Sequence, residues 1–229
     1  MILFEQIKKI EIEISSYCNA SCPLCPRNLF GYEKIDLGYT KKHLTLKEIK
    51  QILNKNFLKQ IEKIVFEGNF GDPLMNPELL KIIEYLDKPI DIYTNASLQT
   101  EDFWKKLAKY PVTVYFAIDG LEDTHSIYRR NTDYNKILKN AKKFISAGGT
   151  AVWKMIQFEH NRHQTIVAES LSKELGFKEF QLVDHGRNSG PVFNNNGKLE
   201  RVIGNFLGSV ELSHYTNLIK HGDMLIEDI

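Results

Sequence analysis

Hydrophobic positions along the chain alternate between segments with a two-residue period and segments with a helical period. Residues 10–14 alternate isoleucine with glutamate, a pattern that is typical of a strand. Residues 43–58 space their apolar side chains along one face of a helix, and Thr45 with Glu48 matches the capping box that begins a helix. The same alternation continues: further strands are expected at residues 64–66, 90–94, 112–118, 151–158 and 180–183, and further helices at residues 77–86, 101–110, 134–147 and 165–175.

Six strands that alternate with five helices predict an α/β fold with parallel strands and right-handed crossovers. A complete eight-fold barrel usually needs about 250 residues. The six units therefore predict a partial (β/α)6 TIM-like barrel that is open on one side, with an open doubly wound sheet as the alternative. Both architectures place the active site at the carboxyl ends of the strands.

The periodicity of hydrophobic residues is weaker at the end of the chain than in its first 190 residues. Residues 184–197 are rich in glycine and asparagine and indicate a loop, and no clear strand follows them. We therefore expect a barrel core over residues 1–190 and a C-terminal extension over residues 191–229.

Composition narrows the class of protein. Hydrophobic residues make up 42% of the chain and charged residues 26%, which is ordinary globular usage. The 30 basic residues nearly balance the 29 acidic ones, so no net field attracts nucleic acid or an anionic membrane. The opening apolar run is too short for a signal peptide, and no segment approaches the roughly 20 apolar residues of a membrane span. We expect a cytoplasmic protein without a nucleic-acid or membrane partner.

The three cysteines of the chain, Cys18, Cys22 and Cys25, lie together in a C-x3-C-x2-C pattern directly after the first expected strand. An odd number of cysteines cannot form a closed set of disulfides, and such short ring closures are strained. Three soft thiolates on one loop can bind three irons of a [4Fe–4S] cluster and leave the fourth iron open to an external ligand. A zinc site, a thioredoxin-like pair of Cys22 and Cys25, and three inert thiols are the alternatives.

This spacing, on the loop after the first strand of a βα-repeat chain, resembles that of the radical S-adenosylmethionine (SAM) superfamily. The resemblance covers about residues 8–190 and is closest to the catalytic cores of SPASM-type members, whose cysteine-rich extension is absent because no cysteine follows Cys25. It implies that Cys18, Cys22 and Cys25 hold a [4Fe–4S] cluster whose open iron chelates SAM. It also implies reductive cleavage of SAM to a 5′-deoxyadenosyl radical that abstracts hydrogen from a substrate.

The resemblance also implies partners. The electron would come from a donor such as flavodoxin or ferredoxin. A peptide or protein is the favoured substrate, with a small molecule second. No catalytic residue is identified beyond the residues that bind the cofactors.

SAM contacts follow from the same resemblance. Residues 68–74 match the glycine-rich motif that binds the methionyl amino group, with Asp72 in place of the usual glutamate. Polar residues that end the third and fourth strands are suited to the ribose hydroxyls, although Ala117 stands where the family often has serine, and the same polar residues are typical of turns. The expected SAM contacts are Leu24, Gly68, Asn69, Gly71, Asp72, Asn95, Asp119, Arg130 and Gln157.

Three further points remain open in the sequence. Arg129 is a weaker candidate than Arg130 for the SAM carboxylate, and Arg187 is expected to border the substrate. The departures at Asp72 and Ala117 also fit a member of the family that binds a cluster but is inactive. A zinc-stabilised binding module without enzymatic activity is the alternative outside the family.

Overall fold

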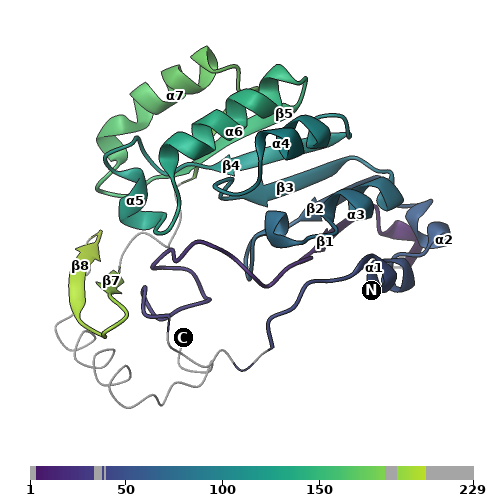
Figure 1. Ribbon diagram of the computed structural model, residues 1–229, viewed down its shortest axis with the longest axis horizontal. Coiled ribbons are helices and arrows are strands. Elements are labelled where there is room, and N and C mark those ends of the chain that lie inside the picture. The colour runs from purple at the N-terminus through teal and green to yellow at the C-terminus, as the bar shows by residue number, and fades with distance from the viewer. Residues whose placement is uncertain (1–3, 34–37, 39, 184–189, 205–229) are drawn as a thin grey trace.

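The computed structural model describes residues 4–33, 38, 40–183 and 190–204. Its centre is a parallel sheet with strand order β1-β2-β3-β4-β5-β6 (Figure 1). A doubly wound sheet reverses its strand order at a switch point, whereas the strands of a barrel follow one another around it. The sequential order confirms the partial barrel, and β1 and β6 are the two edges of this sheet among the described residues. The strands are β1 (Lys9–Ile12), β2 (Lys63–Phe66), β3 (Ile90–Thr94), β4 (Val112–Ala117), β5 (Thr150–Ile156) and β6 (Glu179–Val183).

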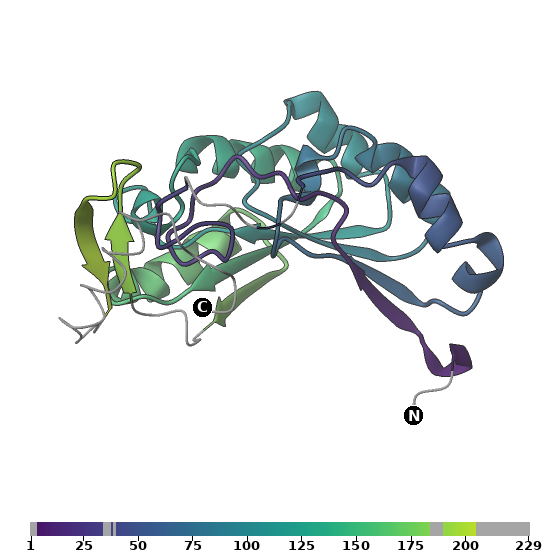
Figure 2. The ribbon, with the colours of Figure 1, turned by 90° about the horizontal axis from the view of Figure 1, so that it is seen from below.

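Helices gather on one face of the curved sheet (Figure 2). The main hydrophobic core fills the space between this sheet face and the helices, and Trp104 and Trp153 are its largest fully buried members. The α-helices are α1 (Leu46–Ile52), α2 (Lys55–Leu58), α3 (Leu79–Leu86), α4 (Glu101–Leu107), α5 (His125–Tyr128), α6 (Tyr134–Ser146) and α7 (Thr165–Glu174). The short 3-10 helices are η1 (Phe4–Gln6), η2 (Pro73–Met75) and η3 (Arg162–Gln164).

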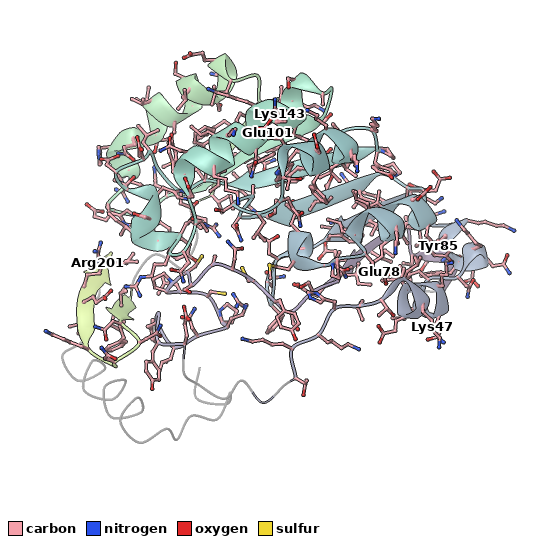
Figure 3. The ribbon with its side chains drawn as sticks, in the orientation of Figure 1. Lys47, Glu78, Tyr85, Glu101, Lys143 and Arg201 are labelled. Carbon is pink, nitrogen blue, oxygen red and sulfur yellow. The ribbon has the colours of Figure 1, made fainter. Side chains whose placement is uncertain are left out.

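Surface ion pairs join neighbouring helices. Glu101, which begins α4, contacts two lysines of α6. One carboxylate oxygen lies 2.8 Å from Lys139 Nζ, and the other lies 3.1 Å from Lys143 Nζ. Glu101 and Lys143 are labelled in Figure 3. Hydrogen bonds from Lys139 and Lys143 lower the pKa of Glu101 to about 2. Lys139 is exposed and the other two groups are half-buried, so these surface pairs contribute little to stability.

The opposite face of the sheet is polar. The interior of a closed barrel is usually filled by branched apolar side chains. Here Lys63 Nζ lies 2.7 Å from a carboxylate oxygen of Asp91, and the rings of Tyr93 and Tyr115 stack at 4.3 Å between centroids. This polar face leads to the carboxyl ends of the strands, where the expected site residues gather.

Two expectations about local structure are wrong. The single helix expected over residues 43–58 is divided into α1 and α2, because the Asn54 side chain accepts hydrogen bonds from the backbone of Asn56 and Phe57 and begins a new helix. The capping box of Thr45 and Glu48 at the start of α1 is confirmed. The loop expected over residues 184–197 contains a strand, and a second strand follows it where no clear strand is expected.

The first of these strands, β7 (Gly190–Phe193), pairs antiparallel with the second, β8 (Leu199–Ile203). The sequence conceals β7 because it begins with glycine and proline, which weaken a strand pattern. Its stability comes from distant contacts: the backbone N–H of Phe193 donates to the carbonyl of Phe30 at 2.8 Å. None of the helices in the described ranges is long and apolar enough to span a membrane.

Candidate functional site

A cavity of about 190 Å³ lies at the carboxyl ends of the strands and is lined by all three cysteines. The other lining residues come from the segment that carries the cysteines, the turn after β2, the ends of β3, β4 and β5, and α5 with the residue after it. This is the edge of the sheet where a barrel fold places its active site. The lining residues are Cys18, Ala20, Cys22, Cys25, Arg27, Glu67, Gly68, Asn69, Gly71, Asp72, Tyr93, Thr94, Asn95, Ala117, Tyr128, Arg129, Lys154 and Ile156.

The sulfurs of Cys18 and Cys22 accept hydrogen bonds from surrounding nitrogens. Cys18 Sγ accepts from the backbone N–H of Ala20 at 3.3 Å and from Asn95 Nδ2 at 3.6 Å. Cys22 Sγ accepts from Arg129 Nη1 at 3.8 Å. Burial raises the pKa of Cys18 to about 12 and that of Cys22 to about 11 in the free-thiol form of the protein.

The three cysteine thiols are suitable ligands for an iron–sulfur cluster. Each thiolate of such a cluster binds a different iron, so the thiols have to border a shared cavity, as these three do. N–H donors to the sulfurs are a regular part of cluster environments. Within the described part of the chain, no three histidine, cysteine, aspartate or glutamate side chains are grouped as ligands of a single metal ion.

Asp72 ties the turn after β2 to the end of β3. Its carboxylate is 2% exposed and accepts from Thr94 Oγ1 at 2.9 Å, from the backbone N–H of Asn95 at 2.9 Å and from Asn95 Nδ2 at 2.7 Å. It also accepts from the backbone N–H of Leu74 at 2.9 Å. The carboxylate that the sequence assigns to SAM therefore organises the cavity wall.

The turn after β2 also packs against the cysteine loop, residues 13–33, which follows β1 and carries the three cysteines. The backbone N–H of Asp72 donates to the carbonyl of Tyr17 at 2.8 Å. A Cβ atom at Gly71 would lie 1.9 Å from the carbonyl oxygen of Ser15, so only glycine permits this approach. Five of the nine expected SAM contacts line the cavity, namely Gly68, Asn69, Gly71, Asp72 and Asn95. Their contact with SAM stays a prediction.

Asp119 lies behind the cavity wall. Its side chain is fully buried: one carboxylate oxygen accepts from Arg129 Nε at 2.5 Å and the other from the backbone N–H of Ile156 at 2.6 Å. The backbone N–H of Asp119 donates to His125 Nδ1 at 3.2 Å. Asp119 thus faces Arg129, and it is Arg129 that lines the cavity.

The remaining expected contacts also lie outside the cavity lining. Arg130 donates to the carbonyl of Phe193 at 2.9 Å and pairs with Glu200 of β8. Gln157 Nε2 donates to Thr165 Oγ1 at 3.2 Å. Leu24 packs against a small hydrophobic cluster. Arg187 falls outside the described residues.

Sequence reasoning missed several lining residues, and strand alternation could have found some of them. Tyr93 lies two residues before Asn95 on the same face of the chain, so both point to one side of the sheet. Lys154 Nζ lies 4.6 Å from the centroid of the Tyr93 ring. Burial raises the pKa of Glu67, and the charge of Lys154 opposes this shift. One wall of the cavity is therefore polar and carries both signs of charge.

His125 gives the region a pH dependence. It is 1% exposed, its Nε2 lies 3.0 Å from Thr132 Oγ1, and burial together with the charge of Arg129 lowers its pKa to about 3. In the unfolded chain the His125 imidazole binds a proton below about pH 6.5, whereas in the folded chain it stays neutral at that pH. The contribution of His125 to stability is therefore complete above pH 6.5 and is lost as pH falls toward 3.

We predict that His125→Asn, which keeps an acceptor for the Asp119 N–H, removes this dependence. At pH 5 the wild type should have lost about 2 kcal/mol relative to pH 7 through His125 alone. Urea unfolding of both proteins at the two pH values measures the difference. An equal loss in wild type and variant would contradict burial of a neutral imidazole.

The chain is similar to known proteins in sequence and in fold. The model of the Radical SAM superfamily matches residues 12–157. The tungsten-containing aldehyde ferredoxin oxidoreductase cofactor-modifying protein of Pyrococcus furiosus is 29% identical over 125 residues, which are 53% of this chain and 33% of that protein.

Two solved structures show a similar fold. SuiB of Streptococcus suis bound to precursor peptide SuiA gives a TM-score of 0.65 at 18% identity, over 79% of this chain and 40% of SuiB. The structure of anSMEcpe with bound AdoMet (SAM) gives a TM-score of 0.62 at 19% identity, over 78% of this chain and 49% of that one. The chain thus spans between one third and one half of the length of these relatives.

Proposed function

Because the chain belongs to the Radical SAM superfamily, a family of enzymes that use a [4Fe–4S] cluster and SAM, we propose that it binds both and acts as an enzyme. The observation that carries the proposal is the position of the three cysteine thiols, which border one cavity together with the ends of β2 to β5. A structural zinc site would not need a cavity of this kind next to the strand ends.

The cavity residues have distinct roles in this proposal. Cys18, Cys22 and Cys25 hold the cluster. When bound and reduced, the cluster would supply the one electron for reductive cleavage of SAM, and that cleavage would supply the radical chemistry for hydrogen abstraction from a substrate. The chain orients SAM through the backbone of residues 68–71 and through Asn95.

Arg129 replaces Arg130 as the partner of the SAM carboxylate in our proposal. A guanidinium suits a carboxylate because it offers several N–H donors in a fixed fork. Arg129 lines the cavity, whereas Arg130 is bound to the β7–β8 hairpin. The Asp119 carboxylate accepts a hydrogen bond from Arg129. In our proposal it therefore holds this arginine and does not bind the ribose of SAM.

A peptide or protein is the substrate that we favour. SuiB, which shares the fold, has been crystallised with its precursor peptide, and the polar cavity wall offers hydrogen-bonding groups to a peptide backbone. Modification of a small-molecule cofactor is the second candidate, because the Pyrococcus furiosus relative is a cofactor-modifying protein. We further propose residues 1–190 as the core, residues 191–229 as an extension, and a flavodoxin or ferredoxin as the electron donor.

Anaerobic reconstitution with iron and sulfide tests the proposed function. We expect a reduced-cluster signal in electron paramagnetic resonance that SAM perturbs, together with formation of 5′-deoxyadenosine. A cluster without cleavage would favour an inactive member of the family. Bound zinc and no cluster would contradict the assignment of the cysteines.

Deuterium transfer distinguishes the two substrate classes. The reconstituted enzyme is incubated with extract from cells grown in heavy water, and deuterium in 5′-deoxyadenosine reports hydrogen abstraction from an extract component. If the substrate is a peptide or protein, treating the extract with a protease beforehand abolishes the transfer. Transfer that survives protease and follows the low-molecular-mass fraction would favour the cofactor.

A further inference from the structure

Arg129 joins a cysteine sulfur to a buried carboxylate. Its Nη1 donates to Cys22 Sγ at 3.8 Å, and its Nε donates to Asp119 at 2.5 Å. The Arg129 side chain is 17% exposed and that of Asp119 is fully buried. The guanidinium carbon also lies 5.2 Å from the centroid of the Tyr128 ring. The guanidinium is thus fixed on several sides at the cysteine loop.

Asp119 is itself held rigidly. Its second carboxylate oxygen accepts from the backbone N–H of Ile156 at the end of β5, and its own N–H is bound by His125 Nδ1. Burying two charges is costly unless each has good partners, and here each has them. A guanidinium keeps its proton in proteins, and the Asp119 carboxylate balances its charge. These contacts of Asp119 and Arg129 keep the Arg129 Nη1 donor directed at Cys22 Sγ.

A cationic donor at a cysteine that ligates iron affects reduction. Reduction adds an electron to the cluster, and hydrogen bonds to the sulfurs together with nearby positive charge favour the reduced form. A charged donor is stronger than a neutral one. The donors at Cys18, from Ala20 and Asn95, are neutral, whereas the donor at Cys22 is a cation.

We propose that Arg129 raises the reduction potential of the cluster through its hydrogen bond to Cys22, and that Asp119 is the positioning residue that holds Arg129 there. This inference rests on the proposed function only in that Cys22 ligates the cluster. It assigns to Arg129 a role that exists before SAM binds.

The reduction potential of the reconstituted protein, measured without SAM by electron paramagnetic resonance during a redox titration, tests the proposal. Arg129→Gln should lower the equilibrium constant for reduction at least tenfold, which corresponds to about 59 mV for one electron. Arg129→Lys, which keeps the charge but loses the forked geometry, should lower it less. Its smaller change also tests the proposal if Arg129→Gln does not fold.

The neighbouring arginine provides a matched control. Arg130 carries the same charge on the adjacent residue, but it is bound to Phe193 and Glu200. Arg130→Gln should change the equilibrium constant less than twofold. A cluster that assembles normally in Arg129→Gln and Arg129→Lys and titrates at the wild-type potential would overturn the inference while leaving the proposed function intact. A wild-type protein that assembles no cluster would instead overturn the proposed function.

The role of Asp119 is tested by combining substitutions. If Asp119 holds Arg129 at Cys22, then Arg129→Gln should change the potential far less in the Asp119→Asn background than in the wild type. Asn keeps an oxygen that can accept from the Ile156 N–H. An equal change in both backgrounds would show that Arg129 reaches Cys22 without this anchor.

Discussion

Cys22→Ala is expected to abolish cluster assembly, and Cys18→Ala and Cys25→Ala should do the same. The chain has three cysteines, so none can replace a lost ligand. Cys22 is 7% exposed and belongs to a small hydrophobic cluster, so alanine leaves the surrounding fold in place at a modest cost in stability. Iron and sulfide per chain after reconstitution, together with the visible absorption of the cluster, measure the effect.

Ser21→Ala is a matched control on the same loop. The Ser21 side chain is buried like that of Cys22, but it accepts a hydrogen bond from Asn131 and offers no thiol. This variant should retain the iron content of the wild type. If any single cysteine variant also retained it, the three-cysteine assignment would be wrong.

Asp72→Ala should destabilise the protein by about 2 to 5 kcal/mol, because it removes the acceptor at the centre of a buried network and each stranded buried donor costs about 1 to 3 kcal/mol. Thr94, Asn95 and Leu74 would each be left with a buried donor that has lost its partner. The same change should weaken SAM binding, because Asn95 is held beside Cys18 by the Asp72 carboxylate. Urea unfolding of the cluster-free chain measures stability, and SAM titration of the reduced cluster measures binding.

Two comparisons make the Asp72 prediction specific. Asp72→Asn keeps one acceptor oxygen and should cost less than Asp72→Ala. Asp102→Ala removes a carboxylate that is 82% exposed and should change stability by less than about 0.5 kcal/mol. A loss below about 1 kcal/mol for Asp72→Ala would show that the network contributes little. Unchanged SAM binding in a folded Asp72→Ala protein would remove Asp72 from the cofactor site.

The sequence predicts the sheet and the cysteine loop well because their signals are local. The residues of β3 carry their own two-residue period, and the three cysteines need no distant partner to be recognised. The roles of the two adjacent arginines, in contrast, depend on residues that are distant in the sequence. Which of Arg129 and Arg130 enters the cavity depends on where α5 ends and on where Asp119 and Glu200 lie. No periodicity in that loop contains this information.

The sequence alone also does not predict whether a polar residue at a strand end binds a ligand or another part of the protein. Asp72 and Asp119 both follow strands, and from the sequence both carboxylates are equally suited to a ligand. In the structure each is surrounded by donors of the protein itself, from Asn95 and Leu74 in one case and from Arg129 and Ile156 in the other. These donors come from neighbouring strands and turns, so only the assembled sheet reveals them.

The contacts between the cysteine loop and the β7–β8 hairpin have a consequence for the order of events during synthesis. The backbone N–H of Glu33 donates to Asn195, which lies 162 residues later in the chain. At about 5 to 20 residues per second, the ribosome releases the loop roughly 8 to 32 seconds before the hairpin that packs against it. During that interval the buried cluster that contains Cys22 lacks Val192 of β7. The surroundings of Cys22 are therefore less complete in the nascent chain than in the folded protein, where Val192 and Ile203 of the hairpin belong to the same buried cluster.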